Sequence, residues 1–111
     1  MDFNVRRVGK VAVIDLVGKI TLSGGNVVLR QKTQELIEGG DHLILFNLLD
    51  VSYMDSTGIS ELLHCFKSAE EKGGTVKLLN PQGKILDLFK VTRLDEVFEI
   101  YHDEQEAVAA F

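Results

Sequence analysis

Few of the residues that mark secreted or metal-binding proteins occur in this sequence. Its 111 residues include one cysteine, one proline and no tryptophan. Cys65 has no second cysteine with which to form an internal disulfide, and no Cys/His spacing typical of a metal site is present. The sequence therefore predicts no metal centre and no cofactor, and the single cysteine favours a reducing compartment.

Long apolar segments are also missing. The first ten residues, MDFNVRRVGK, lack the apolar segment of a signal peptide. The longest apolar stretch, residues 43–49, is interrupted by Asn47 and is far too short to span a bilayer. We therefore expect a cytoplasmic protein that does not associate with a membrane.

An excess of basic residues is absent as well. The formal net charge is −5, and the lysines and arginines are scattered along the chain. Proteins that bind nucleic acid usually concentrate positive charge in a patch or stripe, often with aromatic residues between. The sequence predicts no nucleic-acid partner.

What is present is the composition of a globular domain. Hydrophobic residues make up 45% of the chain and charged residues 26%. That length and composition are typical of one domain with a real core, so we expect residues 1–111 to form a single domain.

Alternating and helical apolar patterns follow one another along the chain. Two apolar runs separated by Gly9-Lys10 read as a strand hairpin, and the later strands alternate with helices in the order β-β-α-β-α-β-α-β-α. This order predicts an α/β fold whose sheet is mixed but mostly parallel, with about five strands and about four helices. The predicted strands are residues 3–8, 11–17, 42–49, 75–79 and 97–101, and the predicted helices are 27–38, 59–72, 80–89 and a short one after Asp103.

Loops that follow parallel strands gather at one edge of a sheet, which is where ligand and partner sites usually lie. Here these loops are residues 18–26, 50–58 and 80–81. The middle loop contains Asp55-Ser56-Thr57-Gly58 immediately before a helical pattern. In one interpretation a hydroxyl of Ser56 or Thr57 only caps the helix. In the other, Ser56 accepts a phosphate, which the positive end of the helix dipole tolerates, and the added charge alters binding of a partner.

Four segments of the chain resemble the STAS domain family, specifically the bacterial anti-sigma factor antagonists. The main one is NLLDVSYMDSTGISELL, in which Asp-Ser-Thr-Gly follows an apolar strand and opens a helix. The others are LVGKI at residues 16–20, GGTVKLL at 73–79, and VTRLDEVF at 91–98. Their order along the chain is also that of the family.

The resemblance implies a regulatory protein and not an enzyme, so no catalytic residue is expected. Unphosphorylated antagonists of this family bind an anti-sigma factor that is also a serine kinase of the GHKL-type ATPases, and a sigma factor is thereby released. The kinase then phosphorylates the serine that corresponds to Ser56, the antagonist dissociates, and a serine phosphatase resets it. Many members carry acidic residues where this chain has Thr21 and Asn47.

The residues expected to contact the partner surround Ser56 or belong to the same family pattern. They are Thr21, Ser23, Asn47, Tyr53, Asp55, Ser56, Thr57 and Gly58.

Two other functions remain as alternatives. In the first, the chain is a STAS scaffold subunit of a stress-signalling or lipid-transport complex, and Ser56 is only a helix cap. In the second, it is a small hydrolase or nucleotide-binding domain that uses Ser23 and Ser56. The second alternative lacks a phosphate-binding loop with lysine, and the neighbouring His64 and Cys65 diverge by about 100° on one helix, which disfavours a catalytic pair.

Overall fold

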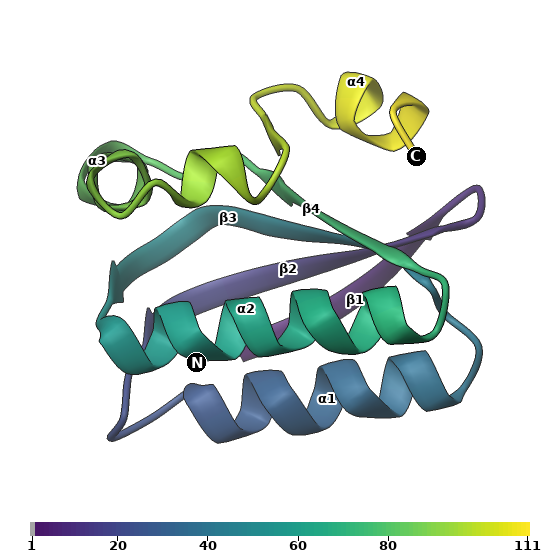
Figure 1. The fold of residues 1–111 in the computed structure, drawn as a ribbon, viewed down its shortest axis with the longest axis horizontal. Coiled ribbons are helices and arrows are strands. Elements are labelled where there is room, and N and C mark those ends of the chain that lie inside the picture. The colour runs from purple at the N-terminus through teal and green to yellow at the C-terminus, as the bar shows by residue number, and fades with distance from the viewer. Residues whose placement is uncertain (1) are drawn as a thin grey trace.

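The computed structural model describes residues 2–111, which form one five-stranded sheet flanked by helices (Figure 1). The strands are β1 (Asp2–Val8), β2 (Val11–Ile20), β3 (Leu43–Met54), β4 (Thr75–Leu79) and β5 (Ile100–Tyr101). The α-helices are α1 (Asn26–Glu38), α2 (Ser56–Glu71), α3 (Gly83–Val91) and α4 (Glu104–Ala109), and η1 (Leu94–Glu96) is a short 3-10 turn.

The strands lie in the order β1-β2-β3-β4-β5. β1 and β2 form an antiparallel hairpin whose turn includes Gly9 at a φ of 60°, a value that glycine adopts without strain. The remaining neighbours pair in parallel. The predicted element order and the mixed, mostly parallel sheet are therefore confirmed.

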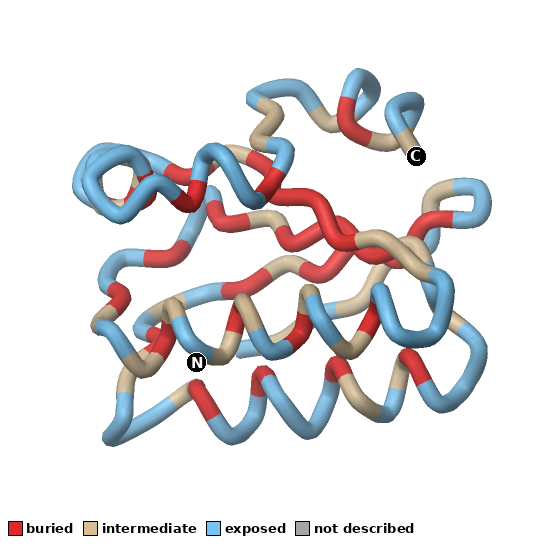
Figure 2. The backbone as a smooth tube through the Cα atoms, viewed as in Figure 1, coloured by how far each residue is buried: buried red, intermediate tan, exposed pale blue. Residues whose placement is uncertain are grey.

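Helices cover both faces of the sheet. α1 and α2 lie side by side (Figure 1). Together with α3 they pack against one face of the sheet, and α4 packs against the other. Buried residues follow the central strands and the inner sides of the helices (Figure 2). In α1 the buried face is formed by Asn26, Leu29, Thr33 and Ile37, which are three or four residues apart. Of the apolar residues from which the sequence predicts this face, Leu29 and Ile37 are buried, Leu36 is half-buried and Val28 is exposed.

Two strands run further than the sequence predicts. β2 passes through Gly18, at a φ of 106°, to Ile20, and β3 continues past residue 49 to Met54. The two extensions pair with each other, because Ile20 lies opposite Met54. Register shifts on either side of Gly18 disturb the alternation of inward and outward residues, which made this part of β3 look like a loop. The predicted loop 50–58 is therefore reduced to Asp55.

The prediction that Asn80-Pro81 opens the third helix is wrong. α3 begins at Gly83 after Gln82, and Asn80 has a φ of 55°. Asparagine is among the residues that tolerate this left-handed conformation, so the pair forms the turn that leaves β4. The last strand is also shorter than predicted, because η1 and the buried Phe98 occupy the preceding segment.

Asp103 caps the terminal helix. Asp103 Oδ1 accepts a hydrogen bond from the backbone N–H of Glu106 at 3.0 Å, as its position before α4 predicts. None of the helices within residues 2–111 is long and apolar enough to cross a bilayer.

Candidate functional site

The carboxyl ends of β2 and β3 meet at one edge of the sheet. Lys19 lies opposite Tyr53 and Ile20 opposite Met54, so the segments that leave the two strands begin side by side. The backbone N–H of Asp55 also donates to the carbonyl of Ile20 at 3.4 Å. The loop 21–25 and the start of α2 are thereby brought together, as the parallel order of the strands predicts.

Asp55 connects these two segments through its carboxylate. Its Oδ1 accepts a hydrogen bond from the backbone N–H of Gly58 at 3.0 Å, which caps α2, and its Oδ2 accepts one from the backbone N–H of Leu22 at 3.1 Å. The hydrogen bond from Gly58 is the main reason that the pKa of Asp55 lies below its usual value of 3.8, and the bond from Leu22 lowers it further. The charged carboxylate thus stabilises both the helix start and the loop.

Ser56 is the first residue of α2, and its side chain is exposed. The interpretation in which Ser56 or Thr57 caps the helix is wrong, because the carboxylate of the preceding residue, Asp55, already accepts the hydrogen bond from Gly58. Within residues 2–111 no hydrogen bond engages the Ser56 hydroxyl. Its oxygen is therefore exposed and has no hydrogen-bond partner among the described residues.

Gly58 lets α2 approach the ends of both strands. A Cβ atom at this position would lie 2.4 Å from the carbonyl oxygen of Ile20 and 2.7 Å from Cγ of Met54. Both distances are far below van der Waals contact, so a larger residue would displace the start of the helix. The glycine therefore fixes where Ser56 stands relative to β2 and β3.

Thr21 and Ser23 belong to a tight turn at the same edge. The backbone N–H of Thr21 donates to the carbonyl of Gly24 at 2.8 Å, and the reverse bond, from Gly24 to Thr21, is 3.2 Å long. The Thr21 hydroxyl lies 3.2 Å from the carbonyl oxygen of Gly24 and 3.2 Å from the Ser23 hydroxyl. The predicted residues thus lie close to Asp55, in an ordered turn.

Tyr53 borders a groove between the end of β3 and α3. Its side chain is 54% exposed, and the groove encloses about 280 Å³. The sequence does not predict that α3 lines this groove. The amphipathic pattern of α3 predicts which of its residues face the core, but it does not predict that Lys84, Ile85 and Leu88 border an open groove. The groove is lined by Ser52, Tyr53, Met54, Lys84, Ile85 and Leu88.

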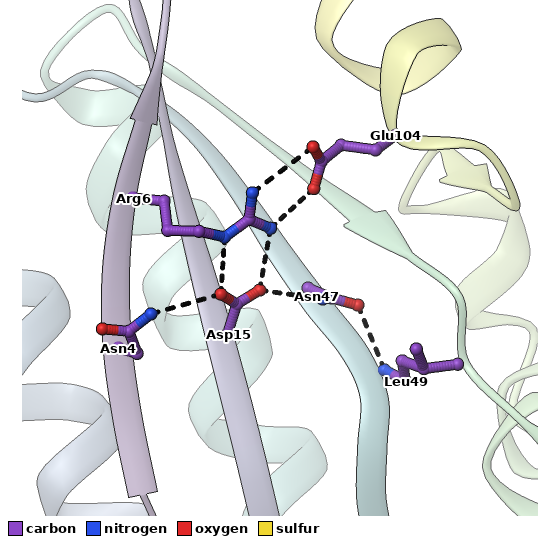
Figure 3. A network of polar contacts seen from close by, with 6 residues as sticks. All are labelled: Asn4, Arg6, Asp15, Asn47, Leu49 and Glu104. Carbon is purple, nitrogen blue, oxygen red and sulfur yellow. Dashed lines mark hydrogen bonds and ion pairs between the residues drawn. The ribbon is translucent and has the colours of Figure 1, made fainter.

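Asn47 does not lie at this edge. It precedes Met54 by seven residues on β3, about 23 Å along an extended strand. Its Nδ2 donates to Oδ1 of Asp15 at 2.8 Å, and its Oδ1 accepts from the backbone N–H of Leu49 at 3.2 Å (Figure 3). The expectation that it lies at the end of the central strand, near the edge that holds Ser56, is therefore wrong, because β3 extends to Met54.

Asn47 belongs instead to a polar network across one face of the sheet. Arg6 on β1 forms two hydrogen bonds to the carboxylate of Asp15, at 2.6 and 3.0 Å, and two to Glu104 on α4, at 2.6 and 3.4 Å (Figure 3). The hydrogen bonds from Arg6, and then that from Asn47, hold the pKa of Asp15 below its usual value. This network ties the first strand to the last helix.

The possible metal ligands, and the neighbours His64 and Cys65, were compared for their placement. Within residues 2–111 no group of three or more His, Cys, Asp and Glu side chains is placed to hold a metal ion. Cys65 is buried between the helices and the sheet, and burial raises the pKa of its thiol to about 11. His64 is exposed, so the two neighbours face different surroundings and do not form a pair.

Comparison with known proteins gives consistent results for sequence and fold. The family model described as "STAS domain" matches residues 2–107. The anti-sigma-B factor antagonist of Bacillus subtilis is 37% identical over 87 residues, which is 78% of each chain.

Solved structures share the arrangement described above. SpoIIAA of Bacillus in its phosphorylated form is 26% identical, with a TM-score of 0.75 over 98% of each chain, and its unphosphorylated form has also been solved. An anti-sigma factor antagonist from Mycobacterium paratuberculosis has a TM-score of 0.86 over 98% of this chain and 92% of its own. Its identity is only 17%, so this last likeness bears on the fold alone.

Proposed function

Because the chain belongs to the STAS domain family, we propose that it is an anti-sigma factor antagonist whose binding to an anti-sigma factor serine kinase is switched off by phosphorylation of Ser56. In this proposal it acts as a single domain, as substrate and binding partner and not as an enzyme, and a serine phosphatase restores the unmodified form. The similarity to the Bacillus subtilis antagonist supports the class of function.

The observation that carries the proposal is the position of the Ser56 hydroxyl. It stands exposed at the first residue of α2 and is not used to cap the helix. A phosphate there would replace no internal hydrogen bond and would enter no core space. The fold would therefore persist while the surface changed.

The change at the surface would be large. A phosphoserine carries nearly two negative charges at neutral pH, and it would stand next to the carboxylate of Asp55. The N–H of Gly58 is already bonded to that carboxylate, and the N–H of Ile59 to the Asp55 carbonyl. The phosphate would thus project outward, where it would repel and obstruct a partner docked at this edge.

The proposed contact surface consists of the predicted residues that the fold gathers around Ser56. Asn47 is left out, since it belongs to the network with Asp15. The surface is formed by Thr21, Ser23, Tyr53, Asp55, Ser56, Thr57 and Gly58.

Phosphate mapping tests the proposal. Each purified anti-sigma factor kinase of the source organism is incubated with the chain and ATP, and modified residues are identified by mass spectrometry. We expect phosphate on Ser56 with at least one kinase, none in the Ser56→Ala variant, and normal modification of Ser60→Ala, whose serine is also exposed on α2. Modification elsewhere, or continued labelling of Ser56→Ala, contradicts the proposal.

The scaffold alternative predicts a different result for Ser56→Ala. If Ser56 were a helix cap, its loss would cost about 1 kcal/mol of stability. The cap in this fold is Asp55, and alanine is well tolerated within a helix, so we expect the melting temperature of Ser56→Ala to equal that of the wild type.

A further inference from the structure

The two lateral edges of the sheet differ in length. One edge is β5, which has only two residues and is followed by α4, whose Ala107 packs in a cluster with Leu79 of β4. The other edge is β1, whose seven residues contain no proline and pair with β2 in an unbroken antiparallel register. Within residues 2–111 no strand pairs with the outer side of β1. A long, regular edge of this kind is a template for pairing with another strand.

Alternate residues of β1 turn their backbone groups away from β2. The two-residue turn Gly9-Lys10 places Val8 opposite Val11, and the residues that flank such a turn form a hydrogen-bonded pair. Hydrogen-bonded and non-hydrogen-bonded pairs alternate along an antiparallel ladder, so the N–H and C=O groups of residues 3, 5 and 7 point outward. These groups are available to a strand that adds to the edge.

The charged side chains of β1 do not protect this edge. Sheets often prevent edge pairing with charged side chains that project beyond the last strand. Arg6 is bonded to Asp15 and Glu104 of its own chain, with one bond of 2.6 Å to each. Arg7 forms an ion pair with Asp41, also within the chain. Both arginines are thus held against their own chain, and the backbone edge is open.

A groove runs beside this edge, between β1 and α1. It encloses about 320 Å³, and its apolar part is formed by the half-buried side chains of Phe3, Val5 and Leu36. Lys32 and Glu35 of α1 complete the lining, with one charge of each sign. A strand added to the edge would cover the apolar part, and a second copy facing the groove would meet no net repulsion.

The sequence of β1 is complementary to itself. In a continuous sheet a two-fold axis perpendicular to the sheet keeps each side chain on its own face, so even-numbered residues must oppose even-numbered ones. With Asn4 on the axis, Asp2 lies opposite Arg6 of the second copy. Phe3 then lies opposite Val5 of the second copy. Oppositely charged and apolar pairs across neighbouring strands stabilise a sheet, and in this register no like charges meet.

Arg6 retains a donor for this contact. A guanidinium group has five N–H donors, and the bonds to Asp15 and Glu104 use four of them. The remaining N–H is on Nη1, and the side chain is 38% exposed. A carboxylate on a neighbouring strand can therefore bind Arg6 without breaking the network of Figure 3.

We propose that the chain forms a two-fold symmetric dimer in which β1 pairs antiparallel with β1 of a second copy, with Asn4 on the axis. The outward backbone groups of Phe3 bond to those of Val5 of the second copy, and the sheet continues through both copies. Ser56 follows β3, which is separated from this edge by β1 and β2. The dimer therefore leaves Ser56 exposed in both copies and is independent of the proposed function.

Analytical ultracentrifugation of the full chain tests the dimer. One pair of strands with its flanking helices is a small interface, so we expect reversible dimerisation between about 10 µM and about 1 mM. Val5→Pro removes an outward N–H and no bond to β2, and an edge strand tolerates proline at such a position. We expect Val5→Pro to weaken dimerisation about tenfold or more. Val5→Thr, which keeps the N–H, should dimerise like the wild type, and circular dichroism checks the fold of both variants.

Disulfide cross-linking tests the register. The backbone groups of Asn4 point toward β2, so the two Asn4 residues form a non-hydrogen-bonded pair with Cα atoms about 4.5 Å apart, within the range of a disulfide. Asn4→Cys should therefore form a covalent dimer with oxidised glutathione as oxidant. Lys10→Cys, exposed at the hairpin turn and far from the axis, is the matched control, and buried Cys65 of the wild type gives the background. We expect rapid cross-linking of Asn4→Cys alone.

Several results would overturn the dimer. They are a wild-type chain that is monomeric up to about 1 mM, a folded Val5→Pro that dimerises like the wild type, and equal cross-linking of Asn4→Cys and Lys10→Cys. If the chain stays monomeric and the amides of Phe3 and Val5 are protected from hydrogen exchange only when the kinase is added, a strand of another protein occupies the edge and the dimer is wrong. None of these measurements involves phosphorylation of Ser56, so failure of the dimer and failure of the proposed function are distinguishable.

Discussion

Leu22 and Asp55 are joined by a hydrogen bond across 33 positions of sequence: the backbone N–H of Leu22 donates to Oδ2 of Asp55 at 3.1 Å. The other carboxylate oxygen caps α2 through the N–H of Gly58. One side chain thus sets the position of the turn and of the helix between which Ser56 stands. The shape of the proposed docking edge depends on this carboxylate more than on any hydroxyl in the segment.

Asp55→Asn tests the charge on this carboxylate. Both hydrogen bonds favour the ionised form and lower the pKa of Asp55, so the stabilisation is complete above the usual pKa of 3.8 and is lost as the pH falls through the lower folded value. Asparagine retains a capping oxygen without the charge. We predict that the variant is less stable than the wild type at pH 7 and that the difference shrinks below about pH 4. Urea unfolding at several pH values measures this, and a difference independent of pH contradicts it.

Gly58→Ala tests the close approach of α2 to the sheet. Alanine favours helix formation by about 1 kcal/mol relative to glycine, which alone would stabilise the protein. The new methyl group would meet the Ile20 carbonyl and the Met54 side chain, and overpacking of this kind costs about 1–3 kcal/mol. We predict net destabilisation in thermal unfolding.

Gly24→Ala is the matched control for that substitution. A Cβ atom there has no neighbour within 4 Å, so its stability should stay close to that of the wild type. Equal stability of Gly58→Ala and Gly24→Ala would show that the helix start is not tightly packed.

Asn47→Asp tests the polar network on the opposite face. The amide nitrogen of Asn47 donates to the Asp15 carboxylate, whose side chain is only 23% exposed. An aspartate would instead place two carboxylates together, which raises the pKa of the pair and costs about 1–2 kcal/mol at neutral pH.

The stability lost in Asn47→Asp should return as the pH falls. With a raised pKa, one of the two carboxyl groups becomes protonated under mildly acidic conditions and can donate to the other, so the variant approaches the wild type below about pH 5. Urea unfolding at neutral and acidic pH measures the change. A variant as stable as the wild type at pH 7 would show that Asp15 does not depend on this donor.

Cys65 should resist thiol reagents in the folded protein. Burial both blocks access and raises the pKa of the thiol to about 11, so almost no thiolate is present at pH 8. We predict slow labelling by a disulfide reagent in native buffer and rapid labelling in denaturant. Rapid reaction of the native protein would indicate that α1 and α2 separate easily from the sheet.

Much of the fold follows from local patterns in the sequence. The buried spacing of Leu29, Thr33 and Ile37, the cap at Asp103, and the run of Thr75–Leu79 as a strand are all set by neighbouring residues. The position of Ser56 at an exposed helix start also follows from the order of strands and helices.

Features that depend on distant pairing could not be predicted. Residues 50–54 form a strand because β2 extends beside them, although Asp50 and Ser52 are typical of a loop. The link from Arg6 to Glu104 spans 98 positions, and nothing in either segment identifies its partner. The same applies to Asn47, whose sequence position suggested the Ser56 edge while its side chain is bonded to Asp15.

The most direct test of the central claim compares the affinities of two forms of the same chain. Unmodified protein and protein quantitatively phosphorylated on Ser56 are titrated by calorimetry against the kinase that modifies it, and circular dichroism confirms that both are folded. We predict that phosphorylation weakens binding about tenfold or more while the spectrum and melting curve persist. Equal affinities of the two folded forms would contradict the account.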